Sequence, residues 1–316
     1  MVEEIEYKES YTSKFAPQEL LQMLTTSRIP LELGRMHKRE MTIFFSDIRS
    51  FVSTSEKMRP EALFRYLNAF LKMAAPIIRK NGGIIDKYIG DAILAIFPAP
   101  DCAIKASIAI HHSLVTLNRR FARINLPPID LGIGVHTGEI MIGILGERKR
   151  MDVTIISDSV NLASRLQNLN KIYGSSILIS DSLYQKLFSD PGAAYNMRFL
   201  DVVQTRGKKE TTCVYEVYDN NSKVSIERRN RTKSVFEKGV WLYHSEKYKD
   251  AAKNFVEVIK HDPNDRVAIF YLHRTAHFLA TSYSLVPITQ TACSNGMTNT
   301  RWALKVLMIS TRSSST

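Results

Sequence analysis

The stretch Phe44-Phe45-Ser46-Asp47-Ile48-Arg49-Ser50-Phe51 places an aspartate at the end of an apolar run. The run starts at Met41 and is typical of a buried strand, and Asp47 stands where the chain would turn towards a helix. A second stretch, Asp86-Lys87-Tyr88-Ile89-Gly90-Asp91-Ala92, contains a turn dipeptide, Gly90-Asp91, between two short apolar strands. This dipeptide is typical of a β-hairpin, so we expect Asp47 and Asp91 to meet at one rim of a sheet.

Two interpretations of these aspartates follow from the residues alone. An aspartate after a strand is often a helix cap, and an aspartate in a Gly-Asp turn is often only a turn former. Alternatively, two neighbouring carboxylates bind Mg²⁺ together with substrate phosphates. Two such ions can flank both the attacking and the leaving oxygen of a phosphoryl displacement. The local sequence leaves both interpretations open.

Length and composition predict one full domain with a sizeable core and a smaller appendage. The chain has 316 residues, of which 44% are hydrophobic and 23% are charged, as in ordinary globular proteins. Its three cysteines are scattered and lack metal-binding spacing, which favours a reducing, cytoplasmic setting. Neither a signal peptide nor an apolar run of about 18 residues is present. We therefore expect a soluble cytoplasmic protein, although a membrane-anchored parent that was truncated before Met1 remains an alternative.

The formal net charge is +12, and the basic residues gather in three clusters. Residues 148–150, 206–209 and 228–233 form these clusters. Aromatic residues are not interleaved with the charges and no nucleic-acid motif accompanies them, so we do not expect nucleic-acid binding. A positive field around a polyphosphate substrate, together with a solvated linker, accounts for the same residues.

The order of strands and helices predicts an α+β sandwich, with an antiparallel sheet covered by helices. Thr137-Gly138-Glu139 is expected to be a turn between two strands, and Ser157 is expected to cap a helix. The expected helices are 60–80, 101–124 and 158–172, and the expected strands are 41–45, 83–89, 92–97, 129–135, 140–145, 153–156, 176–179, 197–202 and 213–218.

The two aspartate stretches resemble the metal-binding segments of class III nucleotidyl cyclases, which make cyclic AMP or cyclic GMP from the triphosphate. The resemblance covers about residues 38–218. It implies a ferredoxin-like core and two Mg²⁺ or Mn²⁺ ions per active site, with Asp47, Ile48 and Asp91 as the metal-binding residues. The loop at Ser50 and Phe51 would cradle the triphosphate, although this chain has Ser50-Phe51-Val52 where the family usually has Gly-Phe-Thr.

A helix segment, Val160-Asn161-Leu162-Ala163-Ser164-Arg165-Leu166, places Asn161 and Arg165 on one face, four residues apart. A solvated polar face is the more common explanation of such a pair. The segment is similar to the Asn-x-Ala-Ser-Arg motif of the cyclases, in which the asparagine orients the ribose and the arginine stabilises charge on the α-phosphate. By the same resemblance, Arg206 takes the place of a lysine for the terminal phosphates, and Lys149 and Arg150 are candidates for a further phosphate contact.

The resemblance also implies how the purine is recognised, through Lys87 and Thr154. A lysine can only donate, which suits the acceptor N1 of adenine, and a threonine hydroxyl can accept from the adenine amino group. Guanine would leave both pairs mismatched. A lysine and threonine pair is similar to a subclass of adenylyl cyclases that is common in bacteria and in soluble animal enzymes, several of which respond to bicarbonate. Activation by bicarbonate is therefore a further expectation.

The function that follows is that of an adenylyl cyclase in signal transduction, converting ATP to 3′,5′-cyclic AMP and pyrophosphate. The family forms head-to-tail dimers, so the resemblance implies a homodimer. In it, Asp47 and Asp91 of one chain would face four residues of the other: Lys87, Thr154, Asn161 and Arg165. A guanylyl cyclase is the competing enzyme. A non-catalytic regulatory or scaffold protein, acting through its helical tail, is the alternative from a different class.

The chain is expected to contain five segments, of which the cyclase domain, 38–219, is the largest. Gly239, Ala251, Phe255 and Pro263 fall at the spacings of a tetratricopeptide repeat, although a generic helical hairpin fits the same pattern. A protein partner for this small α-helical segment is a further expectation. The remaining segments are an N-terminal stretch with a transducer-like helix, 1–37, a charged linker, 220–232, the helical hairpin, 233–283, and an irregular tail, 284–316.

Overall fold

The structure is a computed structural model that describes residues 18–24, 34, 36–147, 150–190, 192–204 and 211–283. The chain divides into two compact units. The first, which we call the sheet unit, contains residues up to Ile172, then 176–197 and 202–220. The second, which we call the helical unit, contains residues 173–175, 198–201 and the chain from Asn221 onwards. The expected tail, 284–316, and most of the expected N-terminal segment, 1–37, lie outside the described residues.

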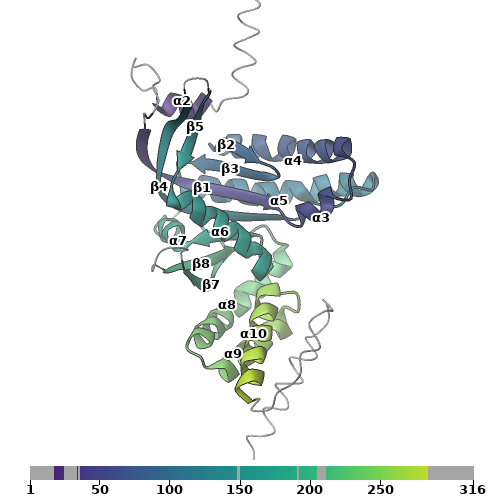
Figure 1. The fold of residues 1–316 in the computed structure, drawn as a ribbon. Coiled ribbons are helices and arrows are strands. Elements are labelled where there is room, and N and C mark those ends of the chain that lie inside the picture. The colour runs from purple at the N-terminus through teal and green to yellow at the C-terminus, as the bar shows by residue number, and fades with distance from the viewer. Residues whose placement is uncertain are drawn as a thin grey trace, which may run out of the picture. The chain divides into compact units, whose positions relative to one another are not determined.

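Eight strands in the described residues form one sheet in the order β2-β3-β1-β4-β6-β8-β7, with β5 paired to β4 (Figure 1). β4 and β6 are parallel, whereas the register of every other described strand pair is antiparallel. The α+β class is confirmed, but the sheet is mixed rather than antiparallel throughout. The strands are β1 Met36–Ile48, β2 Ile84–Ile89, β3 Ala92–Phe97, β4 Leu131–Glu147, β5 Arg150–Ile156, β6 Ile177–Ser180, β7 Met197–Gln204 and β8 Thr211–Val217.

β4 is one continuous strand of 17 residues, so the prediction of a turn at 137–139 was wrong. Thr137 and Gly138 pair with Thr42 and Met41 of β1, and the two threonine hydroxyls are hydrogen-bonded at 2.9 Å. The partner strand β1 satisfies the backbone of the segment, which outweighs its turn propensity. A Cβ on Gly138 would lie 2.6 Å from the Ser159 hydroxyl, so the glycine serves a close approach rather than a turn.

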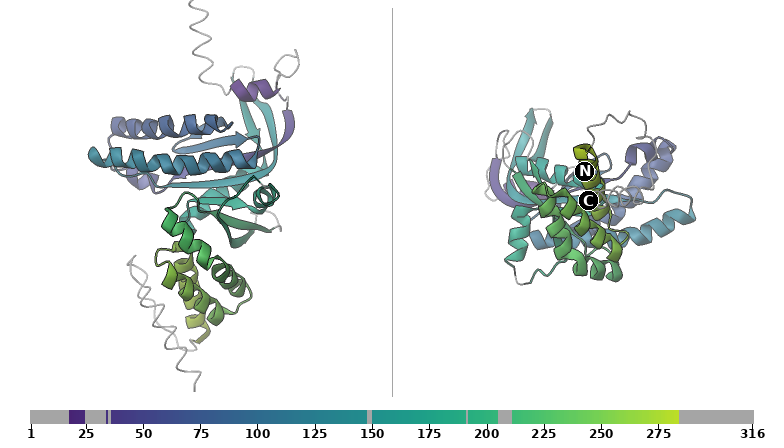
Figure 2. Two further views of the ribbon diagram at one scale, coloured as in Figure 1. Left: turned by 180° about the vertical axis from the view of Figure 1, so that it is seen from behind. Right: turned by 90° about the horizontal axis from the view of Figure 1, so that it is seen from below.

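Helices α4 (Pro60–Lys80), α5 (Pro100–Arg123) and α7 (Asp181–Phe188) pack on one face of the sheet. α4 and α5 lie side by side along the strands (Figures 1 and 2). The apolar stripe of α4, which includes Tyr66, Phe70 and Ile78, packs with Phe44 and Phe97 of the sheet. Each large apolar side chain buried in this way contributes about 1.5–3 kcal/mol. The bounds predicted for α4 and α5 are confirmed to within one residue.

Helices α2 (Gln18–Leu24) and α6 (Asp158–Tyr173) cover the opposite face. Leu20 and Leu24 of α2 are buried in a second apolar cluster with Ile43 and Ile142. Because helices cover both faces of the sheet, the side chains of a central strand are buried whichever face they point to. This is why all six residues of β3 are buried, with no polar face.

The helical unit contains α8 (Lys223–His244), α9 (Tyr248–His261) and α10 (Arg266–Tyr283). The Ser222 hydroxyl accepts from the Ser225 amide at 3.3 Å and caps α8, so most of the stretch expected as a charged linker is helical. A Cβ on Gly239 would lie 2.8 Å from the ring of Phe255, which explains a glycine in the middle of α8. No helix among the described residues is long and apolar enough to cross a bilayer.

A buried ion pair lies inside the helical unit. Arg198 binds both carboxylate oxygens of Asp265, at 2.5 and 3.0 Å, and neither side chain is exposed to solvent. The guanidinium also lies 4.1 Å from the centre of the Phe236 ring. A bidentate contact of this kind satisfies a buried carboxylate better than a lysine could. Residues 198–201 belong to β7. Part of a strand from the segment that resembles the cyclases therefore contributes to the core of the helical unit.

Candidate active site

The structure brings Asp47 and Asp91 together at one edge of the sheet, from the end of β1 and the turn between β2 and β3. Gly90 in that turn has φ 63°, a left-handed conformation that favours glycine. The Ile48 amide donates to Asp91 Oδ2 at 3.1 Å, although 43 residues separate them in the chain. The Asp91 side chain also acts on the Asp47 carboxyl, whose pKa it raises. The two aspartates therefore lie beside each other within one chain, as expected.

The electrostatics of the pair favour a bound cation. Burial raises the pKa of Asp47 to about 7, with further contributions from the hydrogen bond to Asp91 and from its charge. The amide of Ile48 acts in the opposite direction. Burial and the charge of Asp91 also raise the pKa of Tyr66 to about 12. Two carboxylates that resist simultaneous ionisation fit a divalent cation, which would neutralise them.

The loop after Asp47 leads into α3 (Phe51–Ser55). Ser50 has φ 56°, and its carbonyl accepts from the Thr54 amide at 3.1 Å and from the Ser53 hydroxyl at 2.9 Å. A left-handed residue at this position explains why the cyclases usually have a glycine here. Ser50 is exposed and its side chain makes no capping bond, and Phe51 is half-buried.

Lys87 of β2 and Thr154 of β5 meet across the sheet. Lys87 Nζ lies 2.5 Å from Thr154 Oγ1. Thr154 is buried, whereas the Lys87 side chain is 43% exposed, so the ammonium group lies at the surface end of the pair. In the register of β4 and β5, Thr154 stands opposite Gly143, which has no side chain to crowd it.

Asn161 and Arg165 lie on α6, where Asn161 is exposed and Arg165 is half-buried. Arg165 has a buried guanidinium nitrogen, Nη1, that makes no hydrogen bond within the described residues. A buried donor without an acceptor costs about 1–3 kcal/mol. The most economical explanation is an acceptor that binds there, such as a phosphate oxygen.

Two contacts fix α6 against β4. The Ser157 hydroxyl accepts from the Ser159 amide at 3.0 Å, which confirms the predicted cap. Ser157 and Ser159 also donate to the Glu139 carbonyl, at 2.5 and 3.0 Å. A Cβ on Gly134 would lie 2.2 Å from the Ala163 carbonyl oxygen, so only glycine allows the backbone of α6 to pack directly on the strand.

Three of the predicted site residues cannot be placed. Lys149 and Arg206 lie outside the described residues, as does the side chain of Arg150, whose backbone begins β5. Among the residues that can be placed, Asp47 lies beside Asp91 and Lys87 lies beside Thr154, and no hydrogen bond or ion pair in the described chain joins one pair to the other. Asn161 and Arg165 on α6 are hydrogen-bonded to neither pair within the described residues.

One neighbour of Lys87, Asp86, was not among the predicted site residues. Its carboxylate oxygen Oδ2 lies 3.4 Å from Lys87 Nζ, and its side chain is fully buried. In a regular strand the two residues would point to opposite faces, so the pattern gave no reason to connect them. A shift in the register of β2 against β3, between Ile85 and Lys87, brings them together.

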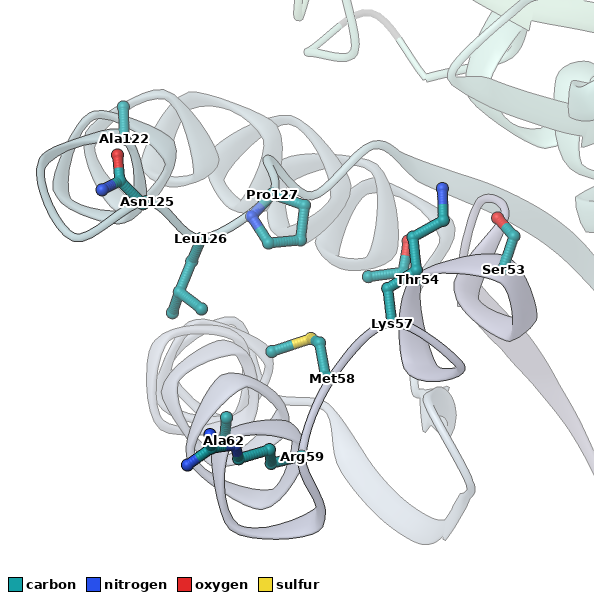
Figure 3. Close-up of a pocket in the computed structure, with 10 residues that line it drawn as sticks. All are labelled: Ser53, Thr54, Lys57, Met58, Arg59, Ala62, Ala122, Asn125, Leu126 and Pro127. Carbon is teal, nitrogen blue, oxygen red and sulfur yellow. The ribbon is translucent and has the colours of Figure 1, made fainter.

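The cavity of Figure 3 lies apart from these residues. Its volume is about 740 Å³, and it lies between the α3–α4 turn and the end of α5. Met58, Ala62 and Leu126 contribute apolar surface to it. None of the predicted site residues lines it, so it is not the place where the two aspartates would act.

Named adenylate cyclases have sequences similar to that of this chain. An "Adenylate cyclase, terminal-differentiation specific" from Dictyostelium discoideum is 36% identical over 273 residues, which are 84% of this chain and 13% of the relative. An "Adenylate cyclase" from Anabaena cylindrica is 40% identical over 212 residues, 65% of this chain and 42% of the relative. The chain therefore spans less than half the length of either relative.

Solved structures share the fold. A bacterial light-regulated adenylyl cyclase matches 73% of this chain and 68% of its own, with a TM-score of 0.62 and 25% identity. Both adenylyl and guanylyl cyclases are among the similar structures, so the fold alone does not decide the base. The family model described as "Adenylate and Guanylate cyclase catalytic domain" matches residues 35–217. With more than half of its residues matched by that model, the chain belongs to the adenylate and guanylate cyclase catalytic domain family.

Proposed function

We propose that this protein is an adenylyl cyclase that converts ATP to 3′,5′-cyclic AMP and pyrophosphate in signal transduction. The observation that carries the choice of ATP is the contact of Lys87 Nζ with Thr154 Oγ1 at 2.5 Å. A lysine donor beside a hydroxyl acceptor matches the N1 acceptor and the amino donor of adenine. Guanine presents the opposite groups at both positions and would leave a buried mismatch. The named adenylate cyclase relatives support the same choice.

The carboxylate pair would hold the metal ions. Asp47 and Asp91, together with Ile48 beside them, fit one or two Mg²⁺ or Mn²⁺ ions, since the pair carries more negative charge than it can stabilise alone. Such ions supply charge stabilisation to the attacking and leaving oxygens of the displacement. The protein positions them, and the left-handed backbone at Ser50 turns the chain into α3, beside the place where the phosphates would lie.

Asn161 and Arg165 would act on the nucleotide from α6. Asn161 would orient the ribose, and Arg165 would bind the α-phosphate as negative charge develops on it. The Nη1 donor of Arg165, which is buried without a partner among the described residues, is consistent with an acceptor that arrives with the substrate. Arg206, Lys149 and Arg150 would contribute further phosphate contacts.

The carboxylate pair makes no hydrogen bond or ion pair with Lys87, Thr154 or α6 within the described residues of one chain, which supports a complete site formed between two chains. We propose a head-to-tail homodimer in which the carboxylate pair of one protomer faces the base-binding residues and α6 of its partner. The twofold symmetry of such a dimer creates two equivalent sites. The resemblance of the sequence to the cyclases implies the same arrangement.

The assay that tests the activity uses the purified full chain with ATP or GTP, in Mg²⁺ or Mn²⁺. We expect cyclic AMP from ATP and at most about one hundredth of that rate from GTP. Preferential production of cyclic GMP would replace the proposal with a guanylyl cyclase, and no turnover of either nucleotide with any metal would leave a non-catalytic role. Bicarbonate added to the same assay tests the expected activation. A pull-down that uses the full chain, including its helical unit, as bait tests the expected protein partner.

A further inference from the structure

Asp86 is a buried carboxylate with an incomplete set of partners. The residue is 7% exposed and its side chain is fully buried. Neither carboxylate oxygen makes a hydrogen bond of good geometry within the described residues. The nearest charge is the Lys87 ammonium, 3.4 Å from Oδ2. Burial raises the pKa of Asp86 to about 6, and Lys87 acts against this rise.

A β-bulge creates this arrangement. Ile85 pairs with Ala95, and Lys87 pairs with the neighbouring residue of β3, Leu94. Asp86 is therefore an extra residue of β2 that has no pairing partner in β3. A bulge of this kind lets neighbouring side chains approach each other and is common beside active sites. Without it, Asp86 and Lys87 would point to opposite faces of the strand.

The lysine ammonium group has three donors. One lies towards Thr154 Oγ1 at 2.5 Å, and a second lies towards Asp86 Oδ2 at 3.4 Å. One donor is left for an acceptor at the exposed side of the group. Holding an ammonium between two oxygens also limits the rotamers of a side chain that is otherwise flexible.

We propose that Asp86 is a positioning residue for base recognition, which holds the Lys87 ammonium so that its remaining N–H points at the N1 acceptor of adenine. This inference rests on the proposed function, because it presupposes that Lys87 contacts the base. Asp86 does not touch the nucleotide itself. It acts by fixing the direction of the Lys87 donor, and thereby contributes to the preference for ATP over GTP.

A purely structural role for Asp86 predicts a different outcome from a positioning role. A carboxylate that stabilised the fold would lower Tm when removed. A buried carboxylate whose pKa is raised above its usual range destabilises the folded state when it is ionised. The positioning role therefore predicts that removal of the charge raises Tm at pH 8 while it impairs selectivity, as in other trade-offs between stability and function.

The experiment compares Asp86→Asn with the unchanged protein, both as full chains. We expect KM for ATP to rise about tenfold, kcat to change less than about threefold, and the ATP over GTP ratio of kcat/KM to fall about tenfold, as one misdirected hydrogen bond would cause. Asp86→Ala serves as a second variant should the asparagine disturb folding. Asp101→Asn is a control, since it removes a carboxylate from another lysine, Lys105 at 2.6 Å on α5, which is not among the proposed base-binding residues.

Lys87→Met distinguishes a failure of the positioning role of Asp86 from a failure of the proposed base contact of Lys87. If Lys87→Met abolishes the preference for ATP and Asp86→Asn leaves it unchanged, the positioning role is wrong while the proposed function stands. If Lys87→Met itself leaves the preference intact, the assignment of the base contact fails and the positioning role fails with it. In the Lys87→Met background, Asp86→Asn should have no further effect on selectivity. An additional loss of selectivity there would mean that Asp86 acts by a route other than Lys87 and would overturn the positioning role. A fall in Tm with equal impairment of both nucleotides would assign Asp86 to the fold alone.

Discussion

Lys87 Nζ and Thr154 Oγ1 lie 2.5 Å apart although 67 residues separate them in the chain. They come from strands that are not neighbours in the sheet, since β2 pairs with β3 and β5 pairs with β4. Only the complete sheet brings a donor and an acceptor together in a geometry that can distinguish two purines.

Exchange of this pair should change the base. Lys87→Glu combined with Thr154→Cys converts a donor into an acceptor and removes the hydroxyl acceptor, so ATP loses two hydrogen bonds. We expect kcat/KM for ATP to fall about a hundredfold and turnover of GTP to become measurable. Steady-state assays with both nucleotides check this, with each single variant as a control. An unaltered preference for ATP would remove both residues from base recognition.

Loss of either site aspartate should abolish turnover without unfolding the protein. Asp47→Ala or Asp91→Ala removes a ligand that the metal ions share, and we expect the rate to fall at least about a hundredfold. Tm in the absence of metal should stay the same or rise, because burial of Asp47 and the charge of Asp91 both disfavour its ionised form, as its raised pKa indicates. Activity and thermal unfolding are measured on the same preparations. Near-normal turnover in either variant would contradict the metal assignment.

The stabilisation by Mg²⁺ should depend on pH. Burial, with the Asp91 side chain beside it, raises the pKa of Asp47 from its ordinary 3.8 to about 7 in the metal-free fold. The folded protein therefore retains a proton that the unfolded chain has lost between about pH 4 and 7, and stability falls as pH rises through this window. At pH 8 the Asp47 carboxylate is ionised and a cation stabilises its buried charge, so Mg²⁺ should raise Tm more at pH 8 than at pH 6. In Asp47→Asn this difference should disappear, and thermal unfolding with and without Mg²⁺ measures it.

A dimer with shared sites predicts complementation between inactive chains. A protomer with Asp47→Ala and a partner with Arg165→Ala together contain one intact site. Random pairing makes half of the dimers mixed, so roughly a quarter of the unaltered activity should return. Co-expression with two affinity tags isolates the mixed dimers for the cyclic AMP assay. Mixed dimers without activity would place a complete site within each chain.

Gly134→Ala should displace α6 and the residues that it carries. The new Cβ would lie 2.2 Å from the Ala163 carbonyl oxygen and 2.3 Å from the Gln167 amide nitrogen, and neither backbone atom can yield without moving the helix. We expect a loss of stability of about 1–3 kcal/mol or more and a fall in kcat. Gly132→Ala is the matched control, because its nearest neighbour is the Gln167 side chain at 3.1 Å. Denaturant unfolding and assays compare the two, and equal effects would argue against a special approach at Gly134.

Local patterns were sufficient for the long helices α4, α5 and α6 and for the proximity of the two aspartates. The apolar spacing of 60–80 and the glycines that follow predicted α4 within its observed bounds, Pro60–Lys80. The Gly90-Asp91 turn and the apolar run before Asp47 predicted that the carboxylates would meet, which the contact of the Ile48 amide with Asp91 bears out. Signals of this kind act over a few residues, so a single sequence contains them in full.

Features that depend on distant segments could not be predicted in this way. Thr137-Gly138-Glu139 has the composition of a turn, yet β1 pairs with it and makes β4 continuous. The chain from Lys223 is polar enough for a linker, but the core of the helical unit stabilises it as α8.

The sequence by itself determined which side chains are available for catalysis and on which elements they stand. The tertiary structure decided which of them touch: Thr154 with Lys87, and Asp86 with Lys87 through a bulge that the strand pattern does not record. The physical reason is that side-chain alternation and turn propensity are properties of a local backbone, whereas strand register is settled by the backbone hydrogen bonds and burial of the whole sheet.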